Sequence, residues 1–198
     1  MDSEKAQHLR ESVRIAYSAA AERPQDEHPF PVGRAFAESL GYPLDLLATI
    51  PSLAIDAFAG VSNVSIFEEL PSKSTVLNLG CGASLDSLIA AQRVGPEGKV
   101  LGVDFSECML ERARQAATEA GLGNLEFHKA GGEKLPLEEG SVDIALVNGI
   151  FNLNPDRDAI FHELARVVKP SGAVYAAELI LTEPLSPETQ QSEADWFA

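Results

Sequence analysis

The sequence predicts an α/β fold in which helices cover both faces of a doubly wound, mostly parallel sheet. Two observations predict it. From residue 74 onward, short apolar runs that end in glycine or a polar residue alternate with segments of helical periodicity. Most of the runs are largely apolar rather than apolar at every second residue only, which is typical of strands buried on both faces. Such strands need helices on each side of a parallel sheet.

Each element of this region follows from its own residues. We expect strands at 75–79, 99–103, 125–128, 142–147 and 173–181, and helices at 85–94, 106–121 and 154–168. Gly95-Pro96 and Gly121 end two of the helices, because glycine adopts the left-handed conformation common after a helix C-terminus and proline cannot continue a helix. Ser106 can cap the start of the second helix.

The first 72 residues have a different character. Apolar residues at helical spacing predict an amphipathic helix through Leu9, Val13, Ala16, Tyr17 and Ala20. Prolines then indicate a loop at 23–33 and short helices at 43–51 and 52–58. We therefore divide the chain into an N-terminal helical extension or cap at 1–72 and a doubly wound domain at 73–198.

Composition limits the partners of the chain. Its 198 residues are 45% hydrophobic, which suits one domain with a substantial core. A net charge of -15 repels phosphate backbones and anionic lipid, so we expect neither nucleic acid nor a membrane as partner. The two cysteines, Cys81 and Cys108, lack zinc-type spacing, so no metal site is expected. The charged start has no apolar signal segment, and a cytoplasmic location is the expectation.

A glycine-containing loop follows the first expected strand. Asn78 lies within that strand, and Gly80, Cys81 and Gly82 follow it directly. In open parallel sheets ligands bind at the carboxyl ends of the strands, where glycine lets the backbone approach a ligand and the next helix offers free N–H groups. The alternative is a plain strand-to-helix turn without a ligand.

A carboxylate ends the second expected strand. Asp104 follows Gly80 by 24 residues, where a carboxylate can accept hydrogen bonds from both hydroxyls of a ribose. Phe105 then suits either the face of an adenine or the protein core. A nicotinamide cofactor is disfavoured, because its fingerprint requires a third glycine at the position of Leu85.

Several segments together resemble the class I S-adenosylmethionine-dependent methyltransferases, and within them the arsenite methyltransferase-like branch. The segments are 76–83 (VLNLGCGA), 94–104 (VGPEGKVLGVD), 109–114 (MLERAR), 133–137 (EKLPL), 148–156 (NGIFNLNPD), 166–170 (RVVKP) and 58–63 (FAGVSN). The resemblance covers about residues 40–198. It implies a Rossmann-like fold, S-adenosylmethionine as cofactor and a small-molecule methyl acceptor.

The resemblance also implies roles for particular residues. Those matching Asn78, Gly80, Cys81 and Gly82 belong to the cofactor loop, and the one matching Asp104 binds ribose. The loop with Gly132 and Glu133 lies by the adenine, and Asn148 faces the methionine part and the reacting centre. This chain departs from the family at four positions: Asn78 replaces an acidic residue, Ser84 and Ser171 replace glycines, and Gly131 replaces an adenine-contacting aspartate. The last change removes one polar contact, about 1–3 kcal/mol.

The catalytic chemistry stays open at this level. His8, His28, His128 and His162 suit the surface or the packing, and we name no catalytic base. Arsenite would need several soft thiolate ligands, whereas Ser87 and Gly149 stand where related arsenic enzymes carry cysteines. The branch resemblance therefore does not predict arsenic chemistry. Two alternatives to a small-molecule methyltransferase remain: a module that binds the cofactor without turnover, and a nucleotide-binding oxidoreductase.

The end of the chain carries a further expectation. Only 17 residues follow Leu181, whereas the family adds two more strands, so the fold is expected to lack the last strands. The fifth strand then forms a mostly apolar sheet edge, and unpaired edges recruit other strands. We expect a homodimer across this edge, or cover by the tail at 182–198.

Overall fold

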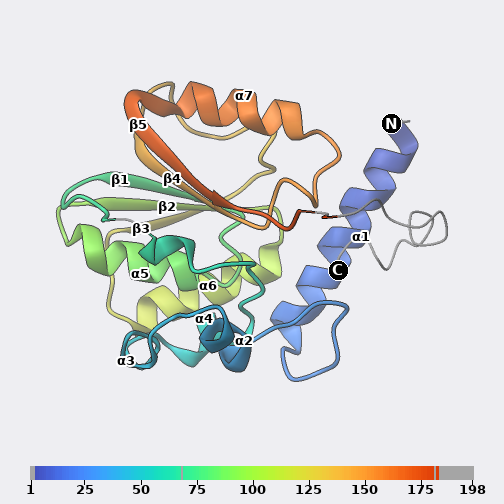
Figure 1. Ribbon diagram of the computed structural model, residues 1–198, viewed down its shortest axis with the longest axis horizontal. Coiled ribbons are helices and arrows are strands. Elements are labelled where there is room, and N and C mark those ends of the chain that lie inside the picture. Colours follow the sequence, from blue (N-terminus) through green and yellow to red (C-terminus); the bar gives the residue numbers. More distant parts are fainter. Residues whose placement is uncertain (1–2, 68, 181, 183–198) are drawn as a thin grey trace.

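The computed structural model describes residues 3–67, 69–180 and 182, and it contains a five-stranded sheet (Figure 1). The strands are β1 (Thr75–Leu79), β2 (Lys99–Asp104), β3 (Leu125–Lys129), β4 (Val142–Asn148) and β5 (Val168–Ala177). Every pair is parallel and the order is β3-β2-β1-β4-β5. The chain winds outward from β1 in both directions, so the prediction of a doubly wound parallel sheet is confirmed. The switch point lies between β1 and β4, where such folds bind ligands.

Helices cover both faces of this sheet. The helices α5 (Leu85–Val94) and α6 (Glu107–Glu119) lie on one face, and α7 (Arg157–Val167) lies on the other. The expected cap of α6 is present, since the Ser106 hydroxyl accepts a hydrogen bond from the Met109 N–H. Strand β1 is buried from Val76 to Leu79, as its mostly apolar sequence requires, and Asn78 is its buried polar residue.

The N-terminal segment adds a further layer on the α5 and α6 side. It forms α1 (Ser3–Glu22), α2 (Arg34–Ser39), α3 (Leu44–Leu47), α4 (Ser52–Asp56) and a 3-10 turn (Val64–Ile66). Its side chains share one buried cluster with the domain that follows, with Leu47, Ile55 and Phe58 against Leu85 and Ile89. The segment α2 and the 3-10 turn were not predicted, because six and three residues are too few for a helical period to show.

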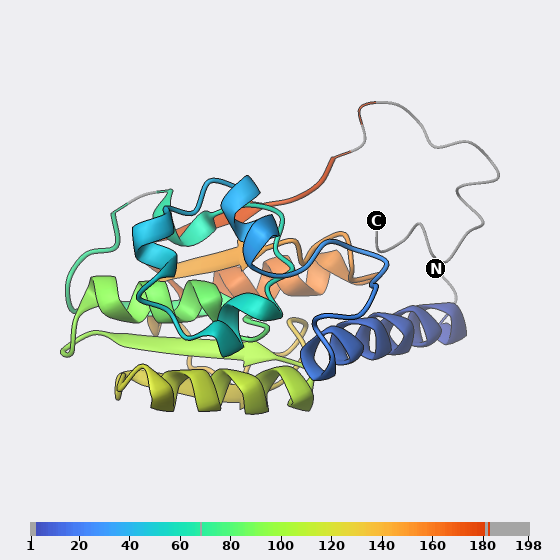
Figure 2. The same cartoon turned by 90° about the horizontal axis from the view of Figure 1, so that it is seen from below.

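Helix α1 takes a separate position, across the carboxyl ends of the strands (Figures 1 and 2). Its C-terminal half is anchored on α6. The Ser18 and Ser106 hydroxyls are 2.9 Å apart, and the Arg112 guanidinium donates to the Ala21 carbonyl over 3.0 Å. The N-terminal half continues beyond α6 and covers the edge of the sheet where ligands are expected. None of the described helices has the length and hydropathy to cross a membrane.

The last elements begin at places the sequence did not indicate. Helix α7 starts at Arg157 instead of Asn154, because the Asn154 side chain accepts the Asp156 N–H and closes a turn first. Strand β5 runs from Val168 to Ala177 rather than over 173–181. It pairs with β4 before and after a register shift between Val142 and Ile144. This irregularity accommodates Pro170, which cannot donate a hydrogen bond, in the edge strand. Residue 181 and the tail 183–198 lie outside the described residues.

Candidate functional site

The loop after β1 is shaped by two glycines. Gly80 and Gly82 have φ values of 69° and 50°, which glycine adopts without the steric cost that other residues incur. The N–H groups of Gly80 and Cys81 both donate to the Val103 carbonyl, over 2.8 and 3.0 Å, so the loop folds over the end of β2. A side chain at position 80 would collide with Ile150. Glycine is therefore required there by conformation and by space.

Asp104 is fixed at the end of β2. Its Oδ2 accepts the Gly82 N–H over 2.9 Å and its Oδ1 accepts the Ser106 N–H over 2.8 Å. Only 8% of the residue is exposed. Burial raises the pKa of this carboxyl group, while the backbone donors act in the opposite direction. The geometry thus gives one rigid carboxylate beside the glycine loop.

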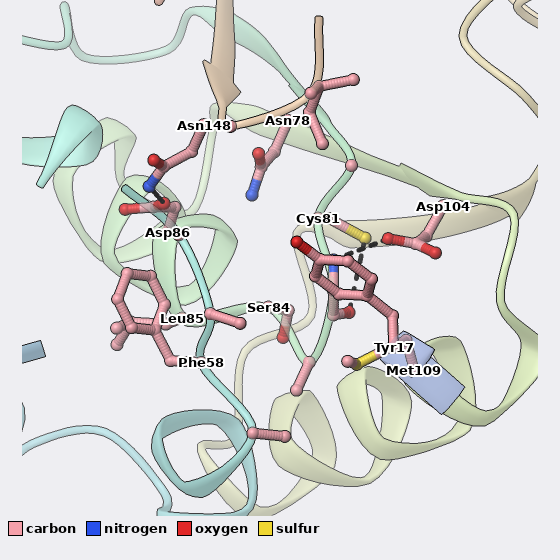
Figure 3. Close-up of a pocket in the computed structure, with 18 of the residues that line it drawn as sticks. Tyr17, Phe58, Asn78, Cys81, Ser84, Leu85, Asp86, Asp104, Met109 and Asn148 are labelled. Atoms are coloured by element: carbon pink, nitrogen blue, oxygen red, sulfur yellow. Dashed lines mark hydrogen bonds between the residues drawn. The ribbon is translucent and has the colours of Figure 1, made fainter. Parts of the chain in front are cut away.

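Two adjoining cavities open at this carboxyl edge. The outer cavity, about 350 Å³, lies between the strand ends and α1 and is lined by residues that include Arg10, Val13, Leu79, Ala130, Gly132 and Glu133. The inner cavity, about 70 Å³, lies toward α4 and α5 and is lined by residues that include Tyr17, Phe58, Asn78, Ser84, Asp86 and Asn148 (Figure 3). Gly80, Asp104, Phe105 and Ile150 belong to both walls.

All nine residues expected from the sequence lie in these walls. Asn78, Gly80, Cys81, Gly82, Asp104, Phe105 and Asn148 line the inner cavity, and Gly80, Asp104, Phe105, Gly132 and Glu133 line the outer one. Phe105 is half-buried between the two cavities rather than in the core. The structure therefore brings together residues from the ends of β1, β2 and β4 and from the loop after β3.

The two asparagines of the site have their side-chain amides occupied. Asn78 donates to the Ser87 hydroxyl over 2.8 Å. Asn148 accepts the N–H groups of Val61 and Ser62 over 2.8 and 3.1 Å, and it donates to the Ser62 carbonyl over 2.7 Å and to Asp86 over 3.0 Å. Asn148 thus holds the backbone after α4 against the end of β4 and forms a fixed wall.

Sequence reasoning missed Asp86 and Tyr42. Asp86 is 5% exposed, lines the inner cavity, and accepts the Tyr42 hydroxyl over 2.5 Å. In Figure 3 its carboxylate points toward the amide of Asn148. Burial raises the pKa of Asp86 and, with the nearby carboxylate, that of Tyr42 as well. A charged residue in the first turn of a mostly buried helix was the available signal, whereas Tyr42 lies too far along the chain to be paired with it.

Glu133 is positioned by two other segments. Its Oε1 lies 3.0 Å from the Arg10 guanidinium of α1 and accepts the Asn154 amide over 2.7 Å. Its other carboxylate oxygen, Oε2, occupies the space in which a side chain on Gly131 would begin. A carboxylate from position 133 therefore stands beside the glycine at position 131, on the wall of the outer cavity.

The fold and the site together define a class of protein. A parallel sheet of this order, with a glycine loop after β1 and a fixed carboxylate at the end of β2, is the arrangement of doubly wound proteins that bind adenosine-containing ligands. A family model described as a methyltransferase domain matches residues 70–197. The chain belongs to this methyltransferase domain family.

Individual relatives agree with this membership. The chain is 34% identical over 154 residues to an arsenite methyltransferase of Halobacterium salinarum, covering 78% of this chain and 39% of that protein. It is 38% identical over 123 residues to a demethylmenaquinone methyltransferase of Lactococcus lactis, covering 62% and 48%. An arsenic (III) S-adenosylmethionine methyltransferase structure from Chlamydomonas reinhardtii superposes with a TM-score of 0.60 at 26% identity, over 85% of this chain and 58% of that one. The chain spans less than half the length of both curated relatives.

Proposed function

We propose that the chain binds S-adenosylmethionine and serves in methyl transfer to a small molecule. One observation carries the proposal: the Asp104 carboxylate is held against the glycine loop by Gly82 in the wall that both cavities share. A ligand that extends from one cavity into the other passes this carboxylate. Such a ligand matches a cofactor with a nucleoside at one end and an amino acid at the other.

The residues present fit this cofactor. The outer cavity has the volume of a small-molecule site, and Asp104 at its edge suits the ribose hydroxyls. The Glu133 carboxylate stands beside Gly131. It therefore supplies an acidic group where the family has an aspartate at the position of Gly131. The amino-acid end then extends along Gly80 and Gly82 toward Asn78, and the sulfur between the two ends lies at the inner cavity.

In this function the chain positions the reactants and excludes water. The bound cofactor supplies an activated methyl group, and transfer needs alignment of the acceptor with the methyl carbon more than an added catalytic group. Arg10 and Val13 of α1 close the outer cavity above, and Ile150 closes it over Gly80. The N-terminal segment 1–72 acts as a cap on the domain at 73–198.

The acceptor is a small molecule in this proposal, but arsenite is disfavoured. The thiol of Cys81 lies in the inner wall, where burial raises its pKa well above the usual range and so disfavours the thiolate. The pKa of Cys108 is raised too, by burial and by a hydrogen bond to Glu22. Arsenic ligands must be thiolates, and Ser87 and Gly149 supply none.

Isothermal titration calorimetry tests the proposed function. Binding of S-adenosylmethionine or S-adenosylhomocysteine without binding of NAD supports it, and a module without turnover then differs only in failing to consume the cofactor. Binding of NAD alone would point to the oxidoreductase alternative. Absence of all binding would overturn the proposal.

A further inference from the structure

The inner cavity is lined by acidic side chains with no basic side chain among the described residues of its wall. Its walls contain two buried carboxylates, Asp86 and Asp104, and among the described residues that line it there is no lysine, arginine or histidine. The two carboxylates come from different elements, the first turn of α5 and the end of β2. Buried charges in proteins are ordinarily paired, so this cavity has the electrostatics of a site for a cation.

The hydrogen-bond donors around Asp86 favour its ionised form, in opposition to the burial that raises its pKa, and they do not neutralise it. Its oxygens accept from the Tyr42 hydroxyl over 2.5 Å and from the Asn148 amide over 3.0 Å. Both donors are neutral, and both are themselves fixed, Tyr42 by its contact with the Phe58 ring and Asn148 by the backbone of Val61 and Ser62. The carboxyl group is therefore held rigidly in the wall, and no cationic side chain neutralises it among the described residues that line the cavity.

A second observation points independently to a ligand in this cavity. The Ser84 hydroxyl is buried at 1% exposure, lines the same cavity, and has no hydrogen-bond partner among the described residues. Ser84 also has a φ of 79°, an unfavourable conformation for any residue with a side chain. Buried polar atoms are nearly always hydrogen-bonded, so this hydroxyl lacks a partner that a bound molecule would supply. The rings of Phe58 and Tyr17 complete walls whose faces attract cations.

We propose that the inner cavity selects a cationic centre and that Asp86 is its counter-ion, so that the chain binds S-adenosylmethionine more tightly than S-adenosylhomocysteine. The inference rests on the proposed function. S-Adenosylmethionine carries a positive sulfonium, whereas S-adenosylhomocysteine has a neutral thioether at that atom. In methyl transfer the acceptor's electron pair forms the new bond to carbon, and the pair of the broken carbon–sulfur bond returns to sulfur. The positive charge leaves the sulfur in that step, and the attraction to Asp86 is lost with it.

Calorimetry with three ligands tests the proposal. The third is sinefungin, in which a carbon bearing an ammonium group replaces the methylated sulfur, so it keeps a cation without a sulfonium. For the wild type we expect S-adenosylmethionine and sinefungin to bind roughly tenfold or more tightly than S-adenosylhomocysteine, as a buried charge pair allows. Equal affinities, or tighter binding of S-adenosylhomocysteine, would overturn the inference while the proposed function stands. Failure of all three to bind would overturn the proposed function and this inference with it.

Variants assign the preference to Asp86. Asp86→Asn should bring the three affinities to within about threefold of one another, since it removes the charge and keeps the shape. Asp86→Glu keeps the carboxylate and should keep the preference. It replaces Asp86→Asn as the test variant if the asparagine variant does not fold, because the longer side chain moves the carboxylate and should change the size of the preference. Asp158→Asn makes the same charge change at an exposed position of α7 on the other face of the sheet, and the preference should stay unchanged. A preference that survives in folded Asp86→Asn would overturn the role of Asp86.

Discussion

The Asp104 carboxylate and the Gly82 backbone N–H are joined by a hydrogen bond of 2.9 Å. This bond ties the loop after β1 to the end of β2, so the glycine loop and the carboxylate keep one relative position. The same carboxylate accepts the Ser106 N–H, which places it at the start of α6 as well. Three elements of the domain therefore converge on one side chain in the wall of both cavities.

Asp104→Ala tests this convergence. We expect S-adenosylhomocysteine binding to weaken roughly tenfold or more, since hydrogen bonds to a charged group contribute about 1.5–3 kcal/mol. Calorimetry measures the affinity, and circular dichroism shows whether the variant is folded. An unchanged affinity in a folded variant would rule out the ribose role of Asp104.

Gly80→Ala tests the requirement for glycine in the loop. A methyl group there meets Ile150 and the backbone has a φ of 69°, so we expect the free energy of unfolding to fall by about 1–3 kcal/mol. The double variant Gly80→Ala with Ile150→Ala should recover the part of the lost unfolding free energy that comes from the collision with Ile150. The part that comes from the positive φ should remain lost. Urea unfolding of the four proteins of this cycle gives both parts. Strict additivity of the two substitutions would contradict the contact.

Glu163 gives a stability that depends on pH. Arg166 donates to both of its oxygens and the Leu135 N–H donates over 2.6 Å, and these bonds lower the pKa of Glu163 from 4.5 to about 2. A depressed folded pKa adds stability above the unfolded value, and this stability is lost as the pH falls through the folded value. We expect Glu163→Gln to cost about 1–2 kcal/mol at neutral pH, with the difference shrinking between about pH 4.5 and 2. A difference that is constant across that range in urea unfolding would be the contrary result.

Arsenite should be a poor substrate. Both thiols of the chain have raised pKa values, and Cys81 is buried in the cavity wall, so a site of several thiolates cannot form within one chain. Mass spectrometry of arsenite incubated with protein, a thiol and S-adenosylmethionine measures the product. Rapid formation of methylarsenicals would show that another set of ligands is used.

The exposed edge of the sheet should mediate self-association. Strand β5 is the last strand of the described sheet; its Val174 is 44% exposed, and Phe161 of the neighbouring α7 is 51% exposed. Unpaired edges recruit other strands, so we expect a homodimer at micromolar concentration and a monomer for Val174→Lys. Sedimentation velocity distinguishes the two states. A monomeric wild type would leave the tail, which lies outside the described residues, as the alternative cover.

Local signals made most of the sheet and the centre of the site, at the glycine loop and Asp104, predictable. Strand β1 and helix α5 match their expected bounds, because a short, mostly apolar run and a glycine-bounded periodic segment each depend on neighbouring residues alone. The glycine loop and Asp104 were found for the same reason, since each directly follows or ends a strand.

Long-range partners left no such signal. Tyr42 and Asp86 lie 44 positions apart, and the partnership arises only when the N-terminal segment packs on α5. The position of Glu133 beside Gly131 depends on Arg10 and Asn154, which both contact its Oε1. Strand β5 starts at Val168 because this residue pairs with Val142 of β4, although Pro170 ordinarily interrupts a strand. The sequence near Pro170 carries no signal of this pairing.

The four hydrogen bonds of Asn148 limit which residues its position can tolerate. Two backbone N–H groups need an acceptor there, while one carbonyl and one carboxylate need a donor. Only the amide side chains of asparagine and glutamine combine these capacities, and glutamine is one methylene too long for the same place. A saturation library at position 148 would therefore retain asparagine almost alone. At Phe105 the wall needs only an apolar surface, so several side chains would be retained. Changes in the methyl acceptor would therefore begin at wall positions such as Phe105, whose side chains make no fixed hydrogen bonds.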